Sequence, residues 1–172
     1  MPTDSSLADF GKKRYEWARR MMSIVEKVAR GKKPLDGFRV GFCLHVTKET
    51  SVLVMAAKGL GADVALCSAN PLSAQEDIVA FLQGEGVSVF AWRNETPAEY
   101  RKCIRDVIAF APDIVTDDGG DLHYAAHAAK AKGIIGGTEE TTSGVKRLSA
   151  LERSKKLRYP VIAVNNARTK YL

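Results

Sequence analysis

Short apolar segments alternate with longer amphipathic segments through most of the chain, and this alternation restricts the fold more than any other feature. The apolar segments, expected to be strands, are 38–44, 63–67, 87–91, 113–116, 134–135 and 160–164. The segments between them, expected to be helices, are 49–60, 73–83, 97–110, 122–132 and 142–157. Strands that alternate with helices of this length form parallel sheets with right-handed crossovers. The sequence therefore predicts an α/β fold with a doubly wound, mainly parallel sheet and helices on both faces.

The first 33 residues are expected to form a helical arm ahead of the sheet, which would occupy residues 34–172 of a single domain. Residues 5–30 have amphipathic spacing, and Gly31, Pro34 and Gly37 would end the helix. Nine of the 26 basic residues fall within and just after this helix: Lys12, Lys13, Arg14, Arg19, Arg20, Lys27, Arg30, Lys32 and Lys33. One side is apolar, with Leu7, Phe10, Trp17, Met21, Ile24, Val25 and Val28. We interpret the basic face as the solvated one.

The net charge of +6 leaves two interpretations of the basic arm. A patch for nucleic acid or an anionic membrane is one, and an ordinary solvated helix face is the other. The second is favoured because no nucleic-acid motif accompanies the charge, so neither nucleic acid nor membrane is expected as a partner. No apolar run approaches the ~20 residues needed to span a bilayer, and the N-terminus is polar. Three cysteines without metal spacing indicate a reducing, cytoplasmic setting.

Polar residues are concentrated after the predicted strands, whereas the loops before the strands are plain. The residues after the strands include His45, Thr47, Glu49, Ser68, Asn70, Ser73, Gln75, the stretch 117–121, the stretch 138–142, Asn165, Asn166, Thr169 and Lys170. Ligands of open parallel sheets bind beyond the carboxyl ends of the strands. Carboxylates and hydroxyls with one histidine and one lysine suit a polyhydroxylated ligand, such as a nucleoside, together with proton transfer.

Structural roles compete with these functional ones. Thr47, Ser73, Asp121 and Thr142 could simply be helix N-caps, and a lone histidine such as His45 is more often structural than catalytic. The run Asp-Asp-Gly-Gly-Asp at 117–121 could alternatively bind a metal, but its spacing is not that of a calcium loop. No metal ligand is therefore predicted.

No residue of this chain is predicted to bind a dinucleotide cofactor. Gly59-Leu60-Gly61 lacks the third glycine of the fingerprint, because position 64 is Val64. This glycine pair also closes a helix ahead of a strand, whereas the fingerprint follows a strand and opens a helix. The sheet is thus predicted to be Rossmann-like in winding without a phosphate cradle.

Several long motifs resemble adenosylhomocysteinase (S-adenosylhomocysteine hydrolase), in order and over essentially the whole chain. They are Leu-Ala-Asp-Phe-Gly at 7–11, Cys-Leu-His-Val-Thr-Lys-Glu-Thr at 43–50, Val-Phe-Ala-Trp at 89–92 with Glu-Thr at 95–96, Asp-Asp-Gly-Gly-Asp-Leu at 117–122, Glu-Glu-Thr-Thr-Ser-Gly at 139–144, and the segment 160–170. In that family NAD oxidises the ribose 3′-hydroxyl, homocysteine leaves from C5′, water adds, and the ketone is reduced to give adenosine. The resemblance thus implies NAD as cofactor and S-adenosylhomocysteine or adenosine as ligand.

The resemblance also assigns roles by position. Glu140 and Lys170 would bind the ribose hydroxyls, Asp118 would handle a proton near C4′ and C5′, and His45 would assist at the 5′ leaving group. These four are the predicted catalytic residues. The predicted substrate-binding residues are Thr47 and Glu49 at the adenine, Thr141 and Thr142 lining the ligand, and Asn70 from the strand-end set.

The sequence departs from the family directly after Lys170, where Tyr171 and Leu172 replace the family's Ser-Lys-Phe-Asp-Asn. The NAD-binding domain is therefore expected to be absent, and the chain alone is expected to be inactive. The leading interpretation is the substrate-binding domain of an adenosylhomocysteinase that works with an NAD-domain partner chain or as a homo-oligomer. A stand-alone adenosine-binding homologue and a structural partner remain as alternatives, and the base could be adenine or hypoxanthine.

Overall fold

The computed structural model describes residues 5–31 and 33–171, and within them it contains one six-stranded parallel sheet. The strands are β1 (Arg39–Cys43), β2 (Asp63–Cys67), β3 (Ser88–Phe90), β4 (Ile114–Asp117), β5 (Gly136–Glu139) and β6 (Val161–Ala163). Their order across the sheet is β3-β2-β1-β4-β5-β6. The winding reverses between β1 and β4, which is where ligands bind in doubly wound sheets.

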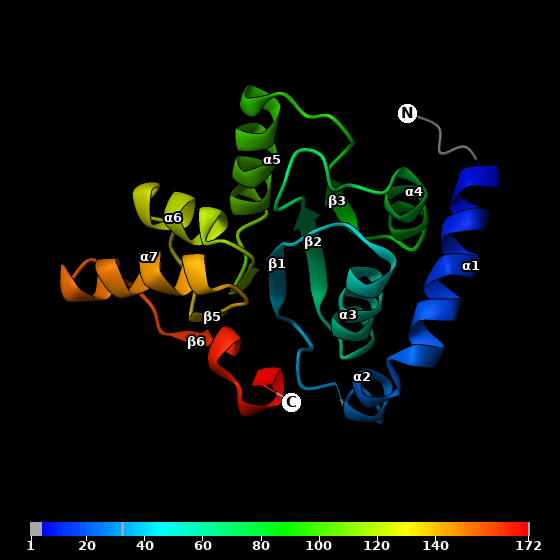
Figure 1. Ribbon diagram of the computed structural model, residues 1–172, viewed down its shortest axis with the longest axis horizontal. Coiled ribbons are helices and arrows are strands. Elements are labelled where there is room, and N and C mark those ends of the chain that lie inside the picture. Colours follow the sequence, from blue (N-terminus) through cyan, green and yellow to red (C-terminus); the bar gives the residue numbers. More distant parts are fainter. Residues whose placement is uncertain (1–4, 32, 172) are drawn as a thin grey trace.

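Helices cover both faces of the sheet, which confirms the predicted α/β class (Figure 1). They are α1 (Ser5–Met21), α2 (Ser23–Val28), α3 (Lys48–Gly59), α4 (Glu76–Gly84), α5 (Pro97–Ala109), α6 (Asp121–Ala128) and α7 (Thr142–Arg153), followed by two short 3₁₀ turns, η1 (Val164–Asn166) and η2 (Arg168–Tyr171). One core joins β1, β2 and β3 to α3 and α4, and a second joins β1, β2 and β4 to α5 and α6. The sheet therefore separates two hydrophobic cores.

The fifth strand lies two residues later than the apolar pair 134–135 that was expected to form it. Its sequence, Gly-Gly-Thr-Glu, has little strand propensity, so sequence alone hides it. Packing explains the glycine: a Cβ at Gly137 would lie 2.6 Å from the ring of His123 and 2.6 Å from the carbonyl oxygen of Val115. Because Gly137 has no side chain, the His123 ring can pack directly against β5.

The arm is not one helix over residues 5–30, as expected, but two. Met22 leaves the helical conformation with φ −102° and ψ 46°, and α2 then packs on α3. An ion pair of 2.7 Å between Arg19 and Glu26 spans the break. The helical spacing continues across residue 22, which is why the change of direction cannot be recognised from the sequence.

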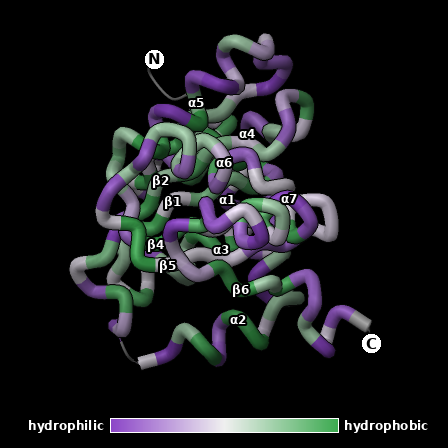
Figure 2. Tube along the Cα trace, turned by 90° about the vertical axis from the view of Figure 1, so that its left-hand side faces the viewer, coloured by the Kyte–Doolittle hydropathy of each residue, from purple (hydrophilic) through white to green (hydrophobic). Residues whose placement is uncertain are grey.

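The expectation that the apolar residues of the arm lie on the side away from solvent is wrong for five of the seven, whereas Leu7 and Val25 are half-buried. Phe10, Trp17, Met21, Ile24 and Val28 are 55–74% exposed, and Figure 2 shows hydrophobic segments along α2 at the edge of the molecule. The packed face of α1 has two small residues, Gly11 against the Asp77 carbonyl and buried Ala18. It also has a stacked aromatic pair, Tyr15 on Phe81, and an ion pair, Arg14 with Asp77. Close helix approach thus depends on small residues rather than on the large apolar ones.

None of the helices described here has the length and apolar character that crossing a lipid bilayer demands.

Candidate functional site

The loops after β1 and β4, at the reversal of the winding, bring two predicted catalytic residues together. Cys43 pairs with Asp117 across these strands, so the residues that follow them are neighbours. His45 Nε2 lies 3.6 Å from Asp118 Oδ2, and both side chains are partly exposed. An imidazole facing a carboxylate at an open edge can pass a proton to a ligand bound there.

Glu140 and Lys170, the other two predicted catalytic residues, also meet. Lys170 in η2 donates from Nζ to the Glu140 carbonyl oxygen at 2.7 Å and to Asn165 Oδ1 at 2.8 Å. The Thr142 hydroxyl donates to the same Asn165 oxygen at 3.3 Å. The C-terminal turn is thereby fixed to the loop after β5. We call His45, Asp118, Glu140 and Lys170 the rim.

Burial raises the pKa of the Glu140 carboxyl above its ordinary value, the negative charge of Asp118 raises it further, and the charge of Lys170 opposes both effects. A carboxyl group with a raised pKa can exchange protons closer to neutral pH than an ordinary glutamate. The rim therefore combines carboxylates, an imidazole and an ammonium group at one edge of the sheet.

The first turn of α3 adds hydroxyl and carboxylate groups beside the rim. Thr47 is the N-cap of α3, and its side chain accepts a hydrogen bond from the Thr50 amide. Glu49 is exposed and pairs with Lys48, which lowers the pKa of the Glu49 carboxyl. His45 and Thr47 also line a surface cavity of about 660 Å³ that is bounded by α1 and the loop before α4.

The remaining predicted residues have mainly local contacts. Asn70 is exposed, and its side chain accepts from the Leu72 amide at 2.8 Å, so it shapes its own turn. Ser73 precedes α4 by three residues and is not its N-cap. Asp121 and Thr142 are not N-caps either: Gly120 occupies that position for α6, and Thr141 caps α7 by accepting from the Gly144 amide. In both cases the true cap is the preceding residue.

A buried polar cluster beneath the rim, which we call the floor, was not recognised from the sequence. It comprises Asp117, His123, Glu139 and Tyr159. His123 Nδ1 lies 3.0 Å from the Tyr159 hydroxyl, and its Nε2 lies 3.1 Å from the Thr138 carbonyl oxygen. The available signal was a histidine, His123, near the start of the predicted helix 122–132.

The floor does not fit a metal ion, although ligand atoms of Asp117, His123 and Glu139 lie within 4.8 Å of one another. A carbonyl only accepts, so His123 Nε2 carries its proton toward Thr138, while Nδ1 is engaged by Tyr159. Both Asp117 oxygens accept backbone N–H groups. Of the possible ligand atoms of Asp117, His123 and Glu139, only Glu139 Oε2 is left without a partner, and one ligand does not make a metal site.

A dinucleotide cofactor does not fit the described strand-end loops. The turn from Leu44 to Thr47 after β1 contains no glycine, and the glycines after β4 follow two carboxylates, Asp117 and Asp118. Backbone N–H groups at a glycine-rich turn bind pyrophosphate, and adjacent carboxylates repel it. No redox step can be assigned to these loops.

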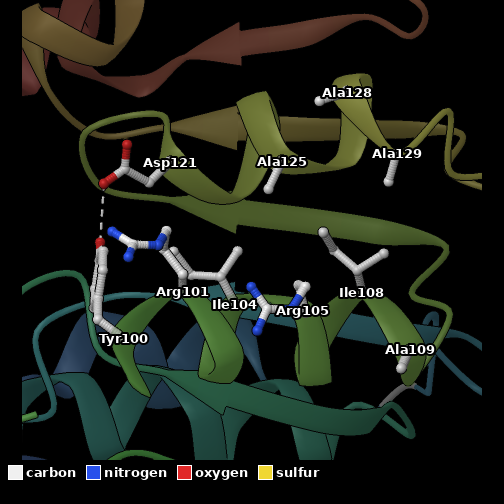
Figure 3. A pocket seen from close by; sticks show the side chains of 10 residues that line it. All are labelled: Tyr100, Arg101, Ile104, Arg105, Ile108, Ala109, Asp121, Ala125, Ala128 and Ala129. Atoms are coloured by element: carbon white, nitrogen blue, oxygen red, sulfur yellow. Dashed lines mark hydrogen bonds between the residues drawn. The ribbon is translucent and has the colours of Figure 1, made fainter. Parts of the chain in front are cut away.

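A cavity of about 760 Å³ lies between α5 and α6, away from the rim (Figure 3). Ile104 and Ile108 of α5 face Ala125 of α6 and Ala129 just after it, and Arg101 and Arg105 of α5 also line the cavity. At one end the Tyr100 hydroxyl donates to Asp121 Oδ2 at 3.0 Å. An apolar groove without converging polar groups lacks the features of a nucleoside site.

Comparison with known proteins gives consistent matches along the chain. The family model for S-adenosyl-L-homocysteine hydrolase matches residues 2–131 and 123–171. The adenosylhomocysteinase of Sulfolobus acidocaldarius is 51% identical over 173 residues, which cover 98% of this chain and 42% of the relative. The S-inosyl-L-homocysteine hydrolase of Methanopyrus kandleri is 45% identical over 98% of this chain and 41% of the relative. The adenosylhomocysteinase of Pyrococcus abyssi is 42% identical over 98% of this chain and 42% of the relative.

The chain thus spans about two fifths of the length of these curated relatives. The two matched segments, 2–131 and 123–171, together include all four residues of the rim. The chain belongs to the S-adenosyl-L-homocysteine hydrolase family.

Proposed function

We propose that this chain binds the nucleoside of S-adenosylhomocysteine or adenosine along the rim. The observation that carries the proposal is the convergence of four separate segments: His45 lies 3.6 Å from Asp118, and Lys170 is bonded at 2.7 Å to the Glu140 backbone. Four groups able to hold hydroxyls and move protons meet at one edge of the sheet, at the position where ligands bind in such folds.

The roles proposed for the rim follow from its chemistry and from the family. Glu140 accepts and Lys170 donates hydrogen bonds at the ribose hydroxyls, and the ammonium charge favours loss of a hydroxyl proton. Asp118 takes up or releases a proton near C4′ and C5′, and His45, facing Asp118, serves the 5′ leaving group.

The substrate-binding roles are proposed in the same way. Thr47 and Glu49, in the first turn of α3, hydrogen-bond the base. Thr141 and Thr142 line the ligand at the start of α7, and Asn70 contacts it from the loop after β2.

We propose that the chain as a whole is the substrate-binding domain of a hydrolase. That hydrolase reversibly converts S-adenosylhomocysteine to adenosine and homocysteine. The redox chemistry requires NAD held by a separate domain, from a partner chain or within a homo-oligomer, because the described loops do not fit a dinucleotide. The 172-residue chain alone is then inactive. The alternative is a stand-alone nucleoside-binding homologue without catalysis.

Calorimetric titration of the chain tests the proposal. Adenosine should bind, and 2′,3′-dideoxyadenosine, which keeps the base but lacks both ribose hydroxyls, should bind at least about tenfold more weakly. Inosine in a parallel titration tells which base is preferred, a choice sharpened by the inosyl-specific name of the Methanopyrus kandleri relative. Absence of heat with millimolar adenosine would contradict nucleoside binding.

The catalytic half of the proposal has its own test. S-adenosylhomocysteine with NAD should yield no homocysteine from the chain alone and should yield it once an NAD domain of the family is added. Turnover by the pure chain would show that it binds NAD itself. If neither mixture releases homocysteine, the nucleoside-binding homologue without catalysis is favoured.

A further inference from the structure

The floor contains two carboxyl groups placed side by side on adjacent strands. Asp117 ends β4 and Glu139 ends β5, the two are paired in register, and both side chains are completely buried. Each directly precedes a rim residue, Asp118 and Glu140 respectively. The floor can therefore control where the rim residues lie.

One oxygen of Glu139 connects the two loops that carry those rim residues. Glu139 Oε1 accepts from the Gly119 amide at 2.9 Å, the Thr141 amide at 2.9 Å and the Thr141 hydroxyl at 2.7 Å. Gly119 follows Asp118 in the chain, and Thr141 follows Glu140. A single buried acceptor thus fixes the backbone beside both rim carboxylates.

The packing around Glu139 leaves it little freedom to move. A Cβ at Gly144 would lie 2.2–2.5 Å from its carboxyl atoms, so the first turn of α7 closes directly over the group. The Thr141 hydroxyl that donates to Glu139 also accepts from the Gly144 amide at 3.1 Å. The side chain is held by its bonds and by the helix above it.

No cation among the described residues faces the carboxyl groups of Asp117 and Glu139. The groups that face the pair are the Cys43 thiol of β1, His123 of α6 and Tyr159, and none of them is a cation: burial lowers the pKa of His123. Arg147 of α7 bonds instead to Asp121 and the Gly119 carbonyl. Two bare buried carboxylates are costly, and burial next to Glu139 raises the pKa of Asp117 to about 7.

We propose that Glu139 is a positioning residue that holds Asp118 and Glu140 in their relative places through its bonds to Gly119 and Thr141. The acceptor oxygen, not the charge, carries this role. The consequence for nucleoside affinity rests on the proposed function above, whereas the consequence for the two loops does not.

Hydrogen exchange by NMR on the full chain tests the loops. In the wild type, the Gly119 and Thr141 amides should exchange at least about tenfold more slowly than an exposed loop amide such as that of Gly133. Glu139→Met should speed exchange at both amides by about tenfold and leave β1 and β2 unchanged. Glu139→Gln, which keeps the acceptor, should stay close to the wild type, and Glu152→Met on the exposed face of α7 is the matched control.

The same variants separate positioning from a merely structural role. At a temperature where all are folded, Glu139→Met should weaken adenosine binding about tenfold, and Glu139→Gln should restore it. Unprotected amides in the wild type, or accelerated exchange in Glu139→Gln, would overturn the proposal even if Glu139→Met fails to fold. Unchanged exchange or unchanged adenosine affinity in a folded Glu139→Met would do the same. If the wild type shows the exchange pattern but no adenosine binding, the proposed function fails and the link between the loops stands.

Discussion

Two floor residues end the strands β4 and β5, and the two rim carboxylates directly follow them, yet the two pairs occupy opposite environments. Asp117 and Glu139 are fully buried, whereas Asp118 and Glu140, one residue further, are partly open to solvent. The floor carboxylates are surrounded by backbone donors, and the rim carboxylates face His45 and Lys170. In each of the two sequence pairs, Asp117-Asp118 and Glu139-Glu140, the first carboxyl group is buried in the floor. The second is partly exposed at the rim, where it is proposed to contact the ligand.

Changes at the floor should therefore affect stability, and the largest effect is expected from Gly144→Ala. The new methyl group would meet the Glu139 carboxyl at 2.2–2.5 Å, and such overpacking costs about 3 kcal/mol of unfolding free energy. Gly59→Ala is the control, because nothing lies within 4 Å of its added Cβ. Urea denaturation of both variants measures the difference, and equal stabilities would show that α7 can move away from the floor.

The next effect concerns pH. The pKa of Asp117 is raised to about 7 in the folded protein, above its unfolded value near ~3.9. Its stabilising contribution is complete below pH ~4 and is lost as the pH rises to ~7, because the unfolded chain releases the proton first. The wild type should therefore lose about 2 kcal/mol relative to Asp117→Asn between pH ~5 and ~7.

His123 contributes to the pH dependence of stability with the opposite sign. Because the wild type and Asp117→Asn both contain His123, its contribution cancels in the difference between their unfolding free energies. The pKa of that imidazole is lowered by burial, so its contribution is present above pH ~6.5 and lost at acid pH in both proteins. Parallel stability–pH curves for the two proteins would show that Asp117 is ionised throughout.

Tyr159→Phe should cost less, about 1.5 kcal/mol, because it leaves one buried acceptor, His123 Nδ1, without a partner. Tyr124→Phe keeps its ring over Arg147 and should be nearly neutral. Thermal unfolding compares the two. Since Tyr159 does not reach the rim, a large loss of nucleoside affinity in Tyr159→Phe would contradict the separation of floor and rim.

The rim should behave in the opposite way, with the smallest effect on stability. Lys170→Ala removes an exposed side chain, so unfolding should change by less than ~0.5 kcal/mol while adenosine affinity falls about tenfold. Lys146→Ala, also exposed, controls for loss of a positive charge. An affinity unchanged by Lys170→Ala would remove this lysine from the rim.

Hydrophobic alternation was sufficient to predict a doubly wound parallel sheet. The rule that ligands bind at strand ends indicated which edge of the sheet to consider, and the family resemblance then selected the four rim residues. Two kinds of feature were hidden. β5 was misplaced because its glycines lower strand propensity, and one of them, Gly137, makes room for the His123 ring. The break at Met22 leaves the helical spacing intact. The floor was missed because Asp117 and Glu139 resemble surface acids in a sequence, and only the fold shows that backbone donors surround them.

The close contact between Glu139 and Gly144 also restricts how this family can diversify. A side chain at position 144 needs the volume that the position-139 carboxyl occupies, and a shorter residue at 139 abandons the bonds to Gly119 and Thr141. A substitution at either position alone is therefore expected to destabilise the contact between the first turn of α7 and the floor. Across lineages the two positions should change rarely and in concert, so their joint substitution history would record this contact without any structure.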